Sequence, residues 1–352
     1  MAELRIGILG SGNMFDTHYR AFSTVPGARV VAVACGSRAA RKAESHDLAW
    51  VESAEAMASR DDVEAVVVTT PHALHAAHAL PCLRAGKHVM VEKPMEVSAE
   101  ACDRMNRAAE AAKVNLMVAH SHRYWPAGRL TKSLLQDGAI GELKMVRDTL
   151  VTPGSLEGAG GSWHTDPARA GRGNLIGYGC HVVDRLRWWF GAECEAVFAC
   201  DLQFRTDAPV ETAGMMQLCF MGDGMASFWW NQCTPSPGFP DLVCGAELVG
   251  TEGIIDCRTY AQLRIARATL RSSEAASLRS TSKQTGEWEL VYDQTQAPDA
   301  RDRTFADQAR EFVASILEQR PPEITGYDGR ATVEIIEAAY RSADTATSVR
   351  LR

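Results

Sequence analysis

The sequence predicts a two-domain α/β protein: a doubly wound parallel sheet, then a domain with a large, open, mostly antiparallel sheet. Three observations predict this class. The chain has 352 residues, more than a single hydrophobic core usually serves. Its first third alternates short apolar runs with helical segments, and after His122 a glycine-rich region gives way to longer strand-like segments. We therefore divide the chain into residues 1–122 and 123–352.

Five apolar runs in the first third predict strands that are buried on both faces. They are rich in β-branched residues and lack polar alternation, which is typical of a parallel sheet. Between them, the segment from Ser98 to Lys113 has apolar residues at helical spacing, with Ser98 as the expected N-cap. The predicted strands are Leu4–Leu9, Val30–Cys35, Ala65–Thr69, His88–Val91 and Leu116–Ala119.

The second part predicts antiparallel strands and two closing helices. Phe305 and Phe312 share one face of the first helix, and Ile335 and Ala339 share one face of the second. The polar residues 272–286 predict an exposed loop. The predicted strands are Val197–Phe204, Met215–Phe220, Met225–Trp230, Leu242–Val249 and Leu263–Ala268.

Composition excludes several classes of function. The net charge of −7 has no basic stripe, so a nucleic-acid role lacks support. The ten cysteines contain no C-x-x-C pair, and no apolar run is long enough to span a membrane. The start "MAELRIGILG" lacks the basic and long apolar regions of a secretory leader. We therefore expect a cytoplasmic protein with reduced thiols and no metal site.

The stretch "GILGSGNMFD" predicts a dinucleotide site, because Gly10 and Gly12 stand between a strand and a helix. Gly10 permits the tight turn, Gly12 permits close approach of a pyrophosphate, and the helix N-terminus supplies N–H donors. The third glycine position of this Rossmann motif holds Phe15, which requires local repacking. The alternative is a glycine turn without a cofactor.

The second predicted strand lacks the acidic residue that NAD sites place on the ribose. No acidic residue stands between Asp16 and Glu44, and Ser37 and Arg38 occupy the relevant positions. A guanidinium pairs well with a phosphate, so NADP(H) is expected in preference to NAD(H). The alternative is that these charges are solvated on an exposed helix.

Lys93 ends a buried strand in the stretch "VMVEKPMEVS". Ligands of open α/β sheets bind at the carboxyl ends of strands, so Lys93 is expected beside a nicotinamide. A lysine there can hydrogen-bond a substrate oxygen and take part in proton transfer. The alternative is an ordinary surface lysine.

The whole chain resembles the glucose–fructose oxidoreductase/inositol dehydrogenase (Gfo/Idh/MocA) family. The matching stretches, in order, are "TTPHALHAAHAL", "AGKHVMVEKP", "AHSHRYWPA", "GNLIGYGCHVVD" and "GYDGRATVEIIEAAYRSADT". The resemblance implies an NAD(P)-dependent oxidoreductase of sugars or polyols, with a Rossmann domain and an open sheet that joins dimers or tetramers.

The resemblance also implies roles for individual residues. Lys93 matches the catalytic lysine, His181 matches the histidine that exchanges a proton with the reacting oxygen, and Asp184 matches a partly structural acid. The expected cofactor-binding residues are Gly10, Gly12, Asn13, Met14, Ser37, Arg38, Thr70, Pro71, His75, Glu92, Lys93 and Pro94. The expected substrate-binding residues are His122, Arg123, Tyr124, Trp163, Tyr178 and His181.

One position departs from the family pattern. Four residues before His181 the family often has an aspartate, and here Gly177 provides neither a charge nor a side-chain hydrogen bond. Three interpretations stay open: His181 and Lys93 manage the proton alone, a bulky substrate fills the vacated volume, or redox activity is lost. His181 itself suits proton exchange because the ordinary histidine pKa is near neutrality.

Histidines 72, 75 and 78 are spaced at threes, but we interpret them as residues near the cofactor and not as metal ligands. The expected activity is hydride transfer between nicotinamide and a hydroxyl or carbonyl carbon of a sugar, cyclitol or related ring. Two other functions stay open: cleavage of a glycosidic substituent without net redox change, and a non-catalytic NADP-binding regulator.

Overall fold

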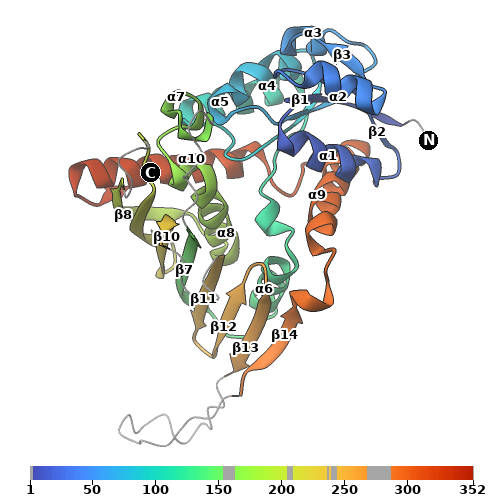
Figure 1. Cartoon of the computed structure of the whole chain (residues 1–352). Coiled ribbons are helices and arrows are strands. Elements are labelled where there is room, and N and C mark those ends of the chain that lie inside the picture. The colour runs from blue at the N-terminus through green and yellow to red at the C-terminus, as the bar shows by residue number, and fades with distance from the viewer. Residues whose placement is uncertain are drawn as a thin grey trace, which may run out of the picture.

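The computed structural model describes residues 3–153, 163–203, 209–235, 238, 244–267 and 287–351. The chain forms two sheets that lie side by side, with helices around the first and along one face of the second (Figure 1). This arrangement confirms the predicted fold class. Among the described helices, none is both long and apolar enough to cross a membrane.

The N-terminal sheet is parallel throughout, with the strand order β3-β2-β1-β4-β5-β6. The five predicted strands are present, and the sequence analysis missed only the three-residue β3 of this sheet. Its strands are β1 (Leu4–Leu9), β2 (Ala28–Ala34), β3 (Ala49–Val51), β4 (Ala65–Val68), β5 (His88–Val91) and β6 (Leu116–Val118).

Five α-helices surround this sheet, and two of them show the expected N-cap chemistry. The Ser98 hydroxyl accepts the Ala101 N–H at 3.2 Å, as predicted, and Ser53 caps α3 in the same way. The helices are α1 (Asn13–Ser23), α2 (Ala39–His46), α3 (Ala54–Ala58), α4 (His75–Arg84) and α5 (Ala99–Ala112).

The second sheet has the order β14-β13-β12-β11-β7-β10-β9-β8-β15 and is antiparallel except for the β7–β10 pair. The predicted strands lie within it, although Leu242, Phe204 and Ala268 are outside the described residues, as is the predicted loop 272–286. The strands are β7 (Leu143–Pro153), β8 (Cys194–Leu202), β9 (Ala213–Phe220), β10 (Gly224–Thr234), β11 (Cys244–Gly250), β12 (Gly253–Arg258), β13 (Gln262–Arg267), β14 (Glu289–Asp293) and β15 (Val349–Arg350).

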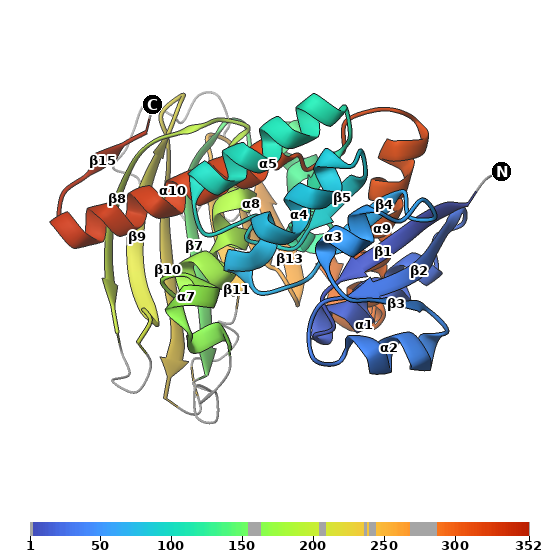
Figure 2. The same ribbon diagram turned by 90° about the horizontal axis from the view of Figure 1, so that it is seen from above.

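Helices cover one face of this second sheet, and α10 lies across its β8 end (Figure 2). The opposite face of the second sheet exposes a row of apolar side chains. Met225, Met145 and Val249 are direct neighbours on adjacent strands in this row, and their side chains are 43–51% exposed. The remaining helices are α6 (Pro126–Gln136), α7 (Pro167–Ala170), α8 (Cys180–Phe190), α9 (Ala300–Leu317) and α10 (Gly326–Thr345).

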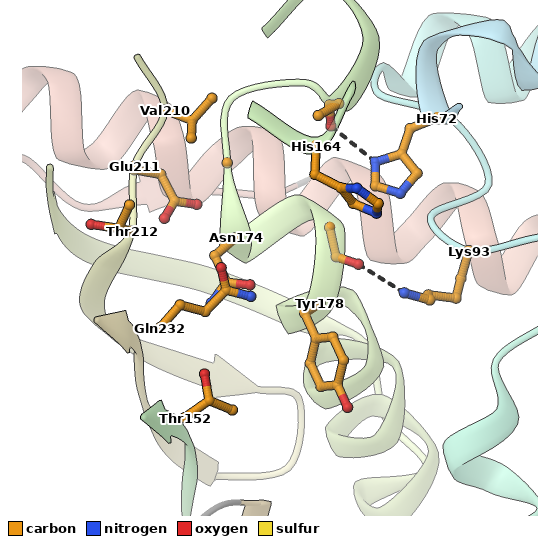
Figure 3. Close-up of a pocket in the computed structure, with 13 residues that line it drawn as sticks. His72, Lys93, Thr152, His164, Asn174, Tyr178, Val210, Glu211, Thr212 and Gln232 are labelled. Atoms are coloured by element: carbon orange, nitrogen blue, oxygen red, sulfur yellow. Dashed lines mark hydrogen bonds between the residues drawn. The ribbon is translucent and has the colours of Figure 1, made fainter. Parts of the chain in front are cut away.

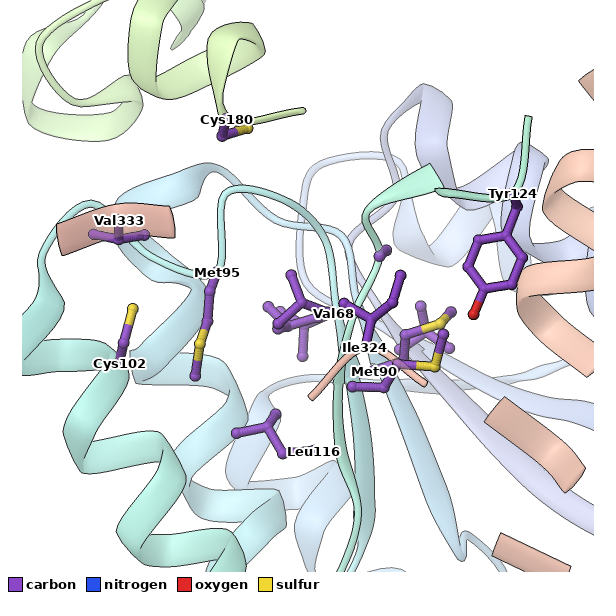
Figure 4. Packing of buried hydrophobic residues seen from close by; sticks show 14 of the residues in the cluster. Val68, Met90, Met95, Cys102, Leu116, Tyr124, Cys180, Ile324 and Val333 are labelled. Carbon is purple, nitrogen blue, oxygen red and sulfur yellow. The ribbon is translucent and has the colours of Figure 1, made fainter. Parts of the chain in front are cut away.

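The C-terminal segments return to the first sheet. Helix α9 packs against α1, α10 packs against α5, and Val118 of β6 donates its N–H to the Ile324 carbonyl at 3.2 Å. Ile324 is fully buried near Met90 and Val68 of the parallel sheet (Figure 4). Residues far along the chain therefore help to build the carboxyl edge where the candidate site lies.

Candidate functional site: a cofactor cradle and two connected cavities

The first glycine turn is shaped to receive a ligand. Gly10 has φ +122°, and a Cβ there would lie 2.4 Å from the Thr69 hydroxyl, so only glycine fits. Gly12 caps α1, and a Cβ on it would meet only Arg38 Nη2, at 3.7 Å. The N-terminal turn of α1 therefore borders open space, where its N–H groups and positive dipole end fit a pyrophosphate.

Phe15, at the third glycine position, is fully buried and stacks on Tyr19, with ring centroids 5.9 Å apart. The aromatic side chain is accommodated by packing along its own helix and against His46, at 5.6 Å. The departure from the glycine motif therefore leaves the turn at Gly10 and Gly12 intact.

The loop after β2 brings Arg38 to this turn. Gly36 has φ +90°, and a Cβ on it would lie 2.5 Å from the Ser11 hydroxyl, which accepts the Arg38 N–H at 3.2 Å. Ser37 and Arg38 are exposed, and no ion pair joins Arg38 to another described residue. Lys42, which follows, is instead paired with Asp16 at 2.5 Å.

The loops after β4 and β5 are fastened together at the sheet edge. The His75 ring nitrogens lie 2.8 Å from the Thr70 carbonyl oxygen and 2.9 Å from that of Pro94. The Lys93–Pro94 bond is cis. Burial is the largest effect on the Glu92 carboxyl and opposes its ionisation, but the 2.7 Å hydrogen bond with His18, together with the charges of His18 and Lys93 and the Lys93 N–H, lowers its pKa overall. These contacts fix the backbone from which Lys93 projects.

Lys93 reaches the stretch in which Gly177 stands where the family often has an aspartate. Its Nζ donates to the Gly177 carbonyl at 2.9 Å and lies 5.3 Å from the centre of the Tyr178 ring. Residues Leu175–Gly179 form a π-helical turn before α8, a feature that is frequent at functional sites. Two other glycines of this stretch allow close packing. A Cβ on Gly173 would lie 2.3 Å from the Glu211 carbonyl oxygen, and a Cβ on Gly179 would lie 2.9 Å from the Leu175 side chain.

His181 belongs to a cluster of rings that we call the histidine–tyrosine cluster: His120, His122, Tyr178, His181 and Tyr260. The His181 and His122 rings stack at 4.0 Å with planes 9° apart. His122 Nε2 lies 2.7 Å from the Tyr260 hydroxyl, which lies 2.8 Å from the Tyr178 hydroxyl. Tyr178 therefore contacts the site both directly, with its ring 5.5 Å from that of His181, and through the hydroxyl of Tyr260.

Burial lowers the pKa of His181 well below its ordinary value, and neighbouring His122 and Lys93 lower it further. The pKa values of His120 and His122 are also lowered, mainly by burial. Among the described residues, His181 Nδ1 and both ring nitrogens of His120 have no hydrogen-bond partner. His181 is therefore a neutral imidazole at pH 7 and can accept a proton.

Two neighbouring cavities share a wall at Lys93. The larger, which we call the inner-edge cavity, has a volume of about 570 Å³ and is lined by Met14, Thr69, Thr70, His72, His75, Glu92, Lys93, Ser121, His122, Trp125, Trp163, His164, Tyr178, His181, Tyr260, Arg301 and Phe305. The second, which we call the sheet cavity, has a volume of about 330 Å³ and is shown in Figure 3. His72, Lys93, His164 and Tyr178 line both.

The inner-edge cavity brings together many of the predicted residues. Both expected catalytic side chains line it, and so do seven others from the predicted sets: Met14, Thr70, His75, Glu92, His122, Trp163 and Tyr178. Pro71 and Pro94 lie in the loops after β4 and β5, which carry several of the lining residues. Asn13 is the first residue of α1. His72, expected near the cofactor, lies against Trp163, with ring centroids 4.8 Å apart.

Arg123 and Tyr124 are placed differently from the expectation. Arg123 is buried and makes a bidentate pair with Asp184, at 2.6 and 2.8 Å, and a contact to Asp328 at 3.1 Å. Tyr124 is 2% exposed, with the Arg129 guanidinium over its ring. Neither lines the two cavities, so the geometry gives no support to the expected substrate contact: Arg123 joins the helices that carry the site.

Several lining residues were not predicted. Trp125, Tyr260, Arg301 and Phe305 line the inner-edge cavity, and Thr152, Asn174, Glu211, Thr212 and Gln232 line the sheet cavity. Asn174 and Trp125 carry a sequence signal, because they lie inside the stretches "GNLIGYGCHVVD" and "AHSHRYWPA", and Phe305 lies on the face of a predicted helix. The others are isolated residues on strands, loops and a helix.

Fold and site together define a two-domain protein that binds a nicotinamide dinucleotide at the edge of its Rossmann sheet. Residues 4–120 match the model of the oxidoreductase family with an NAD-binding Rossmann fold, and residues 129–256 match the GFO/IDH/MocA C-terminal domain. The chain belongs to the GFO/IDH/MocA family of oxidoreductases.

Relatives and solved structures agree with this membership. The chain is 29% identical to levoglucosan dehydrogenase of Pseudarthrobacter phenanthrenivorans over 61% of this chain and 58% of that protein, so the alignment spans little more than half of that relative. It is 26% identical to scyllo-inositol 2-dehydrogenase (NADP(+)) of Bacillus subtilis over 99% and 96% of the two chains. A levoglucosan dehydrogenase in complex with NADH and levoglucosan shares the fold, with a TM-score of 0.85, 24% identity and 99% coverage of both chains.

Proposed function

We propose that the protein transfers hydride between a nicotinamide cofactor and a hydroxyl or carbonyl carbon of a sugar, cyclitol or related ring. One observation carries this proposal: Lys93 and His181 line one cavity at the carboxyl edge of the sheet, beside the cradle of Gly10 and Gly12. The names of relatives, which include sugar and inositol dehydrogenases, favour the same substrate class.

NADP(H) is the proposed cofactor. The Arg38 guanidinium stands next to Gly12 and is not paired with another described residue, so it is available for a 2′-phosphate. The loop after β2 carries no carboxylate that would bind a ribose hydroxyl or repel a phosphate. One relative is named for NADP(+), which agrees with this choice.

The bound nicotinamide would supply or accept the hydride, and the chain would manage the substrate oxygen and its proton. An ammonium has three donors, and the Gly177 carbonyl engages one at 2.9 Å, which leaves others for a substrate oxygen. Neutral His181 then accepts the hydroxyl proton during oxidation. The lowered pKa keeps the imidazole neutral at neutral pH, which is the form that can accept a proton.

Association through the second sheet is also proposed. The exposed row of Met225, Met145, Val249 and Ile254 runs across four neighbouring strands, and an apolar face of this kind is typical of an interface. We expect a homodimer or homotetramer. A cytoplasmic location fits the free thiols of Cys82, Cys102 and Cys180.

The test is a cofactor assay with purified protein, NADP⁺ and NAD⁺, and a panel of sugars, cyclitols and aromatic alcohols. We expect nicotinamide absorbance to rise in step with product, with NADP⁺ preferred. Product without a stoichiometric absorbance change would indicate cleavage without net redox change. Tight NADPH binding without turnover of any ring alcohol would indicate a regulator and contradict the proposal.

A further inference from the structure

The sheet cavity adjoins the inner-edge cavity, since Lys93 lines both and Gly177 lines the sheet cavity. Most of its walls come from the second domain, namely from β7, β10, the residues before β9 and the π-helical turn, and His72 and Lys93 of the first domain close one side (Figure 3). The proposed hydride transfer uses Lys93 and His181, and His181 lines only the inner-edge cavity. The proposed hydride transfer therefore gives no role to the residues that line only the sheet cavity.

A buried polar side chain in the sheet cavity lacks a partner. Asn174 is only 6% exposed, and neither its amide nitrogen nor its amide oxygen bonds to any described residue. Gln232 lines the same cavity (Figure 3). Leaving both ends of a buried amide unpaired is costly, so Asn174 points to a ligand that offers a donor and an acceptor.

The charges of the sheet cavity select the ligand further. Glu211 is buried and accepts hydrogen bonds from the Leu175 N–H, the Trp230 indole and the Tyr340 hydroxyl. Among the described residues that line this cavity, Lys93 at the junction is the only lysine or arginine. A phosphate or carboxylate would therefore have to share this one ammonium with the Gly177 carbonyl while it lies near the Glu211 carboxyl group, whereas neutral hydroxyl groups match the amides and Thr152.

Gly177 lies at the wall that the two cavities share, where its carbonyl accepts the Lys93 hydrogen bond. A Cβ at this position would lie 3.4 Å from His72 Cε1, and both His72 and Lys93 line both cavities. Gly177 does not have a positive φ, so a side chain is compatible with its backbone. An aspartate there would extend toward His72 and narrow the passage beside the Lys93 ammonium.

We propose that the sheet cavity is a second substrate subsite, which binds a neutral, hydroxyl-rich substituent such as a second sugar ring. The first ring reacts beside Lys93 and His181, and the substituent passes Gly177 to reach Asn174 and Gln232. The substrate is then a glycoside or disaccharide. This inference rests on the proposed oxidation of a ring alcohol.

The test compares each monosaccharide that the enzyme oxidises with a disaccharide that contains it, in wild type and in the Asn174→Leu, Gln232→Leu double variant. We expect wild type to have a kcat/KM at least about tenfold higher for the disaccharide, as added hydrogen bonds allow. The double variant should lose that advantage and keep monosaccharide oxidation within about twofold. Gln136→Leu, an exposed change on α6, should alter neither.

A second variant tests the junction. Gly177→Asp should lower disaccharide kcat/KM about tenfold more than monosaccharide kcat/KM. Equal preference for both sugars in wild type, or equal losses in the Asn174→Leu, Gln232→Leu variant, would overturn the subsite. Calorimetry of disaccharide binding to the NADP-loaded protein separates the two proposals: binding that depends on Asn174 without any turnover would contradict the oxidation and support the subsite.

Discussion

The cofactor cradle and the sheet cavity are built in different ways. The cradle uses backbone: Gly10 and Gly36 have positive φ and leave no room for a Cβ, and they lie within one short stretch of sequence. The sheet cavity uses side chains, among them Thr152 and Gln232, that come together only when distant strands pair. A common cofactor is thus held by a local motif, whereas substrate specificity depends on the whole second domain.

The largest effect on cofactor affinity is expected when a methyl group is added to Gly10 of the cradle. Gly10→Ala places a Cβ 2.4 Å from the Thr69 hydroxyl and forces φ +122° on an alanine, so NADPH affinity should fall more than 100-fold. Fluorescence titration measures the loss. The matched control is Gly27→Ala, with φ +80° and nothing within 4 Å, which should cost only about 1–2 kcal/mol of stability. Equal NADPH binding by both variants would contradict the cradle.

The second prediction concerns the buried ion pair between Arg123, which follows β6, and Asp184 of α8. Asp184→Asn leaves a buried guanidinium with less compensation, so the free energy of unfolding should fall by about 3–5 kcal/mol. Chemical denaturation measures it. The folded fraction should keep its KM for a ring alcohol, because neither residue lines a cavity. A large rise in KM with unchanged stability would return Arg123 to the substrate site.

Arg38→Ala should have a smaller and more selective effect. Losing a charge-assisted bond to the 2′-phosphate should weaken NADPH about tenfold and leave NADH within about twofold. The matched control is Arg41→Ala, another exposed arginine on the same helix, which should change neither affinity much. If Arg38→Ala weakened both cofactors alike, Arg38 would serve the pyrophosphate and the NADP preference would fail.

The last effect is a pH dependence of stability from the histidine–tyrosine cluster, which is spread over several histidines. His120, His122 and His181 have lowered pKa values when folded, so the unfolded chain binds more protons below its ordinary histidine pKa of about 6.5. Stability is therefore retained above that value and lost on acidification, by at most about 1.4 kcal/mol per pH unit for each histidine.

Glu211 acts in the opposite sense. Burial raises its pKa to about 7, so its contribution is lost as the pH rises from 4.5 to about 7 and partly offsets the histidines. His120→Leu removes a buried ring with two unpartnered nitrogens and should flatten the acid slope by up to one proton. Denaturation at pH 5 to 7 measures this, and an unchanged slope would count against the assignment.

The sequence predicted the parallel sheet better than the second sheet, for a physical reason. Strands buried on both faces are continuous apolar runs, whereas β7 and β12 contain charged residues such as Arg147 and Asp256, which obscure their pattern. The three-residue β3 is too short to show any period. Its place depends on pairing with β2, which is a tertiary contact.

The site divides in the same way. Gly10, Gly12 and Lys93 could be proposed from the sequence because their chemistry follows from their position after a strand. Tyr260 could not, because it lies 138 positions from its partner His122. The ion pairs of Arg123 could not be foreseen for the same reason: its partners Asp184 and Asp328 are 61 and 205 positions away.

The most direct test of the account is turnover by the Lys93→Ala, His181→Ala double variant. Both side chains line the cavity beside the cradle, and Gly177 supplies no carboxylate to replace them. We predict that kcat for ring-alcohol oxidation falls by at least about 10²–10⁴-fold while NADPH still binds within a few fold of wild type. Wild-type turnover in this variant, with the cofactor bound, would contradict the assignment of the site.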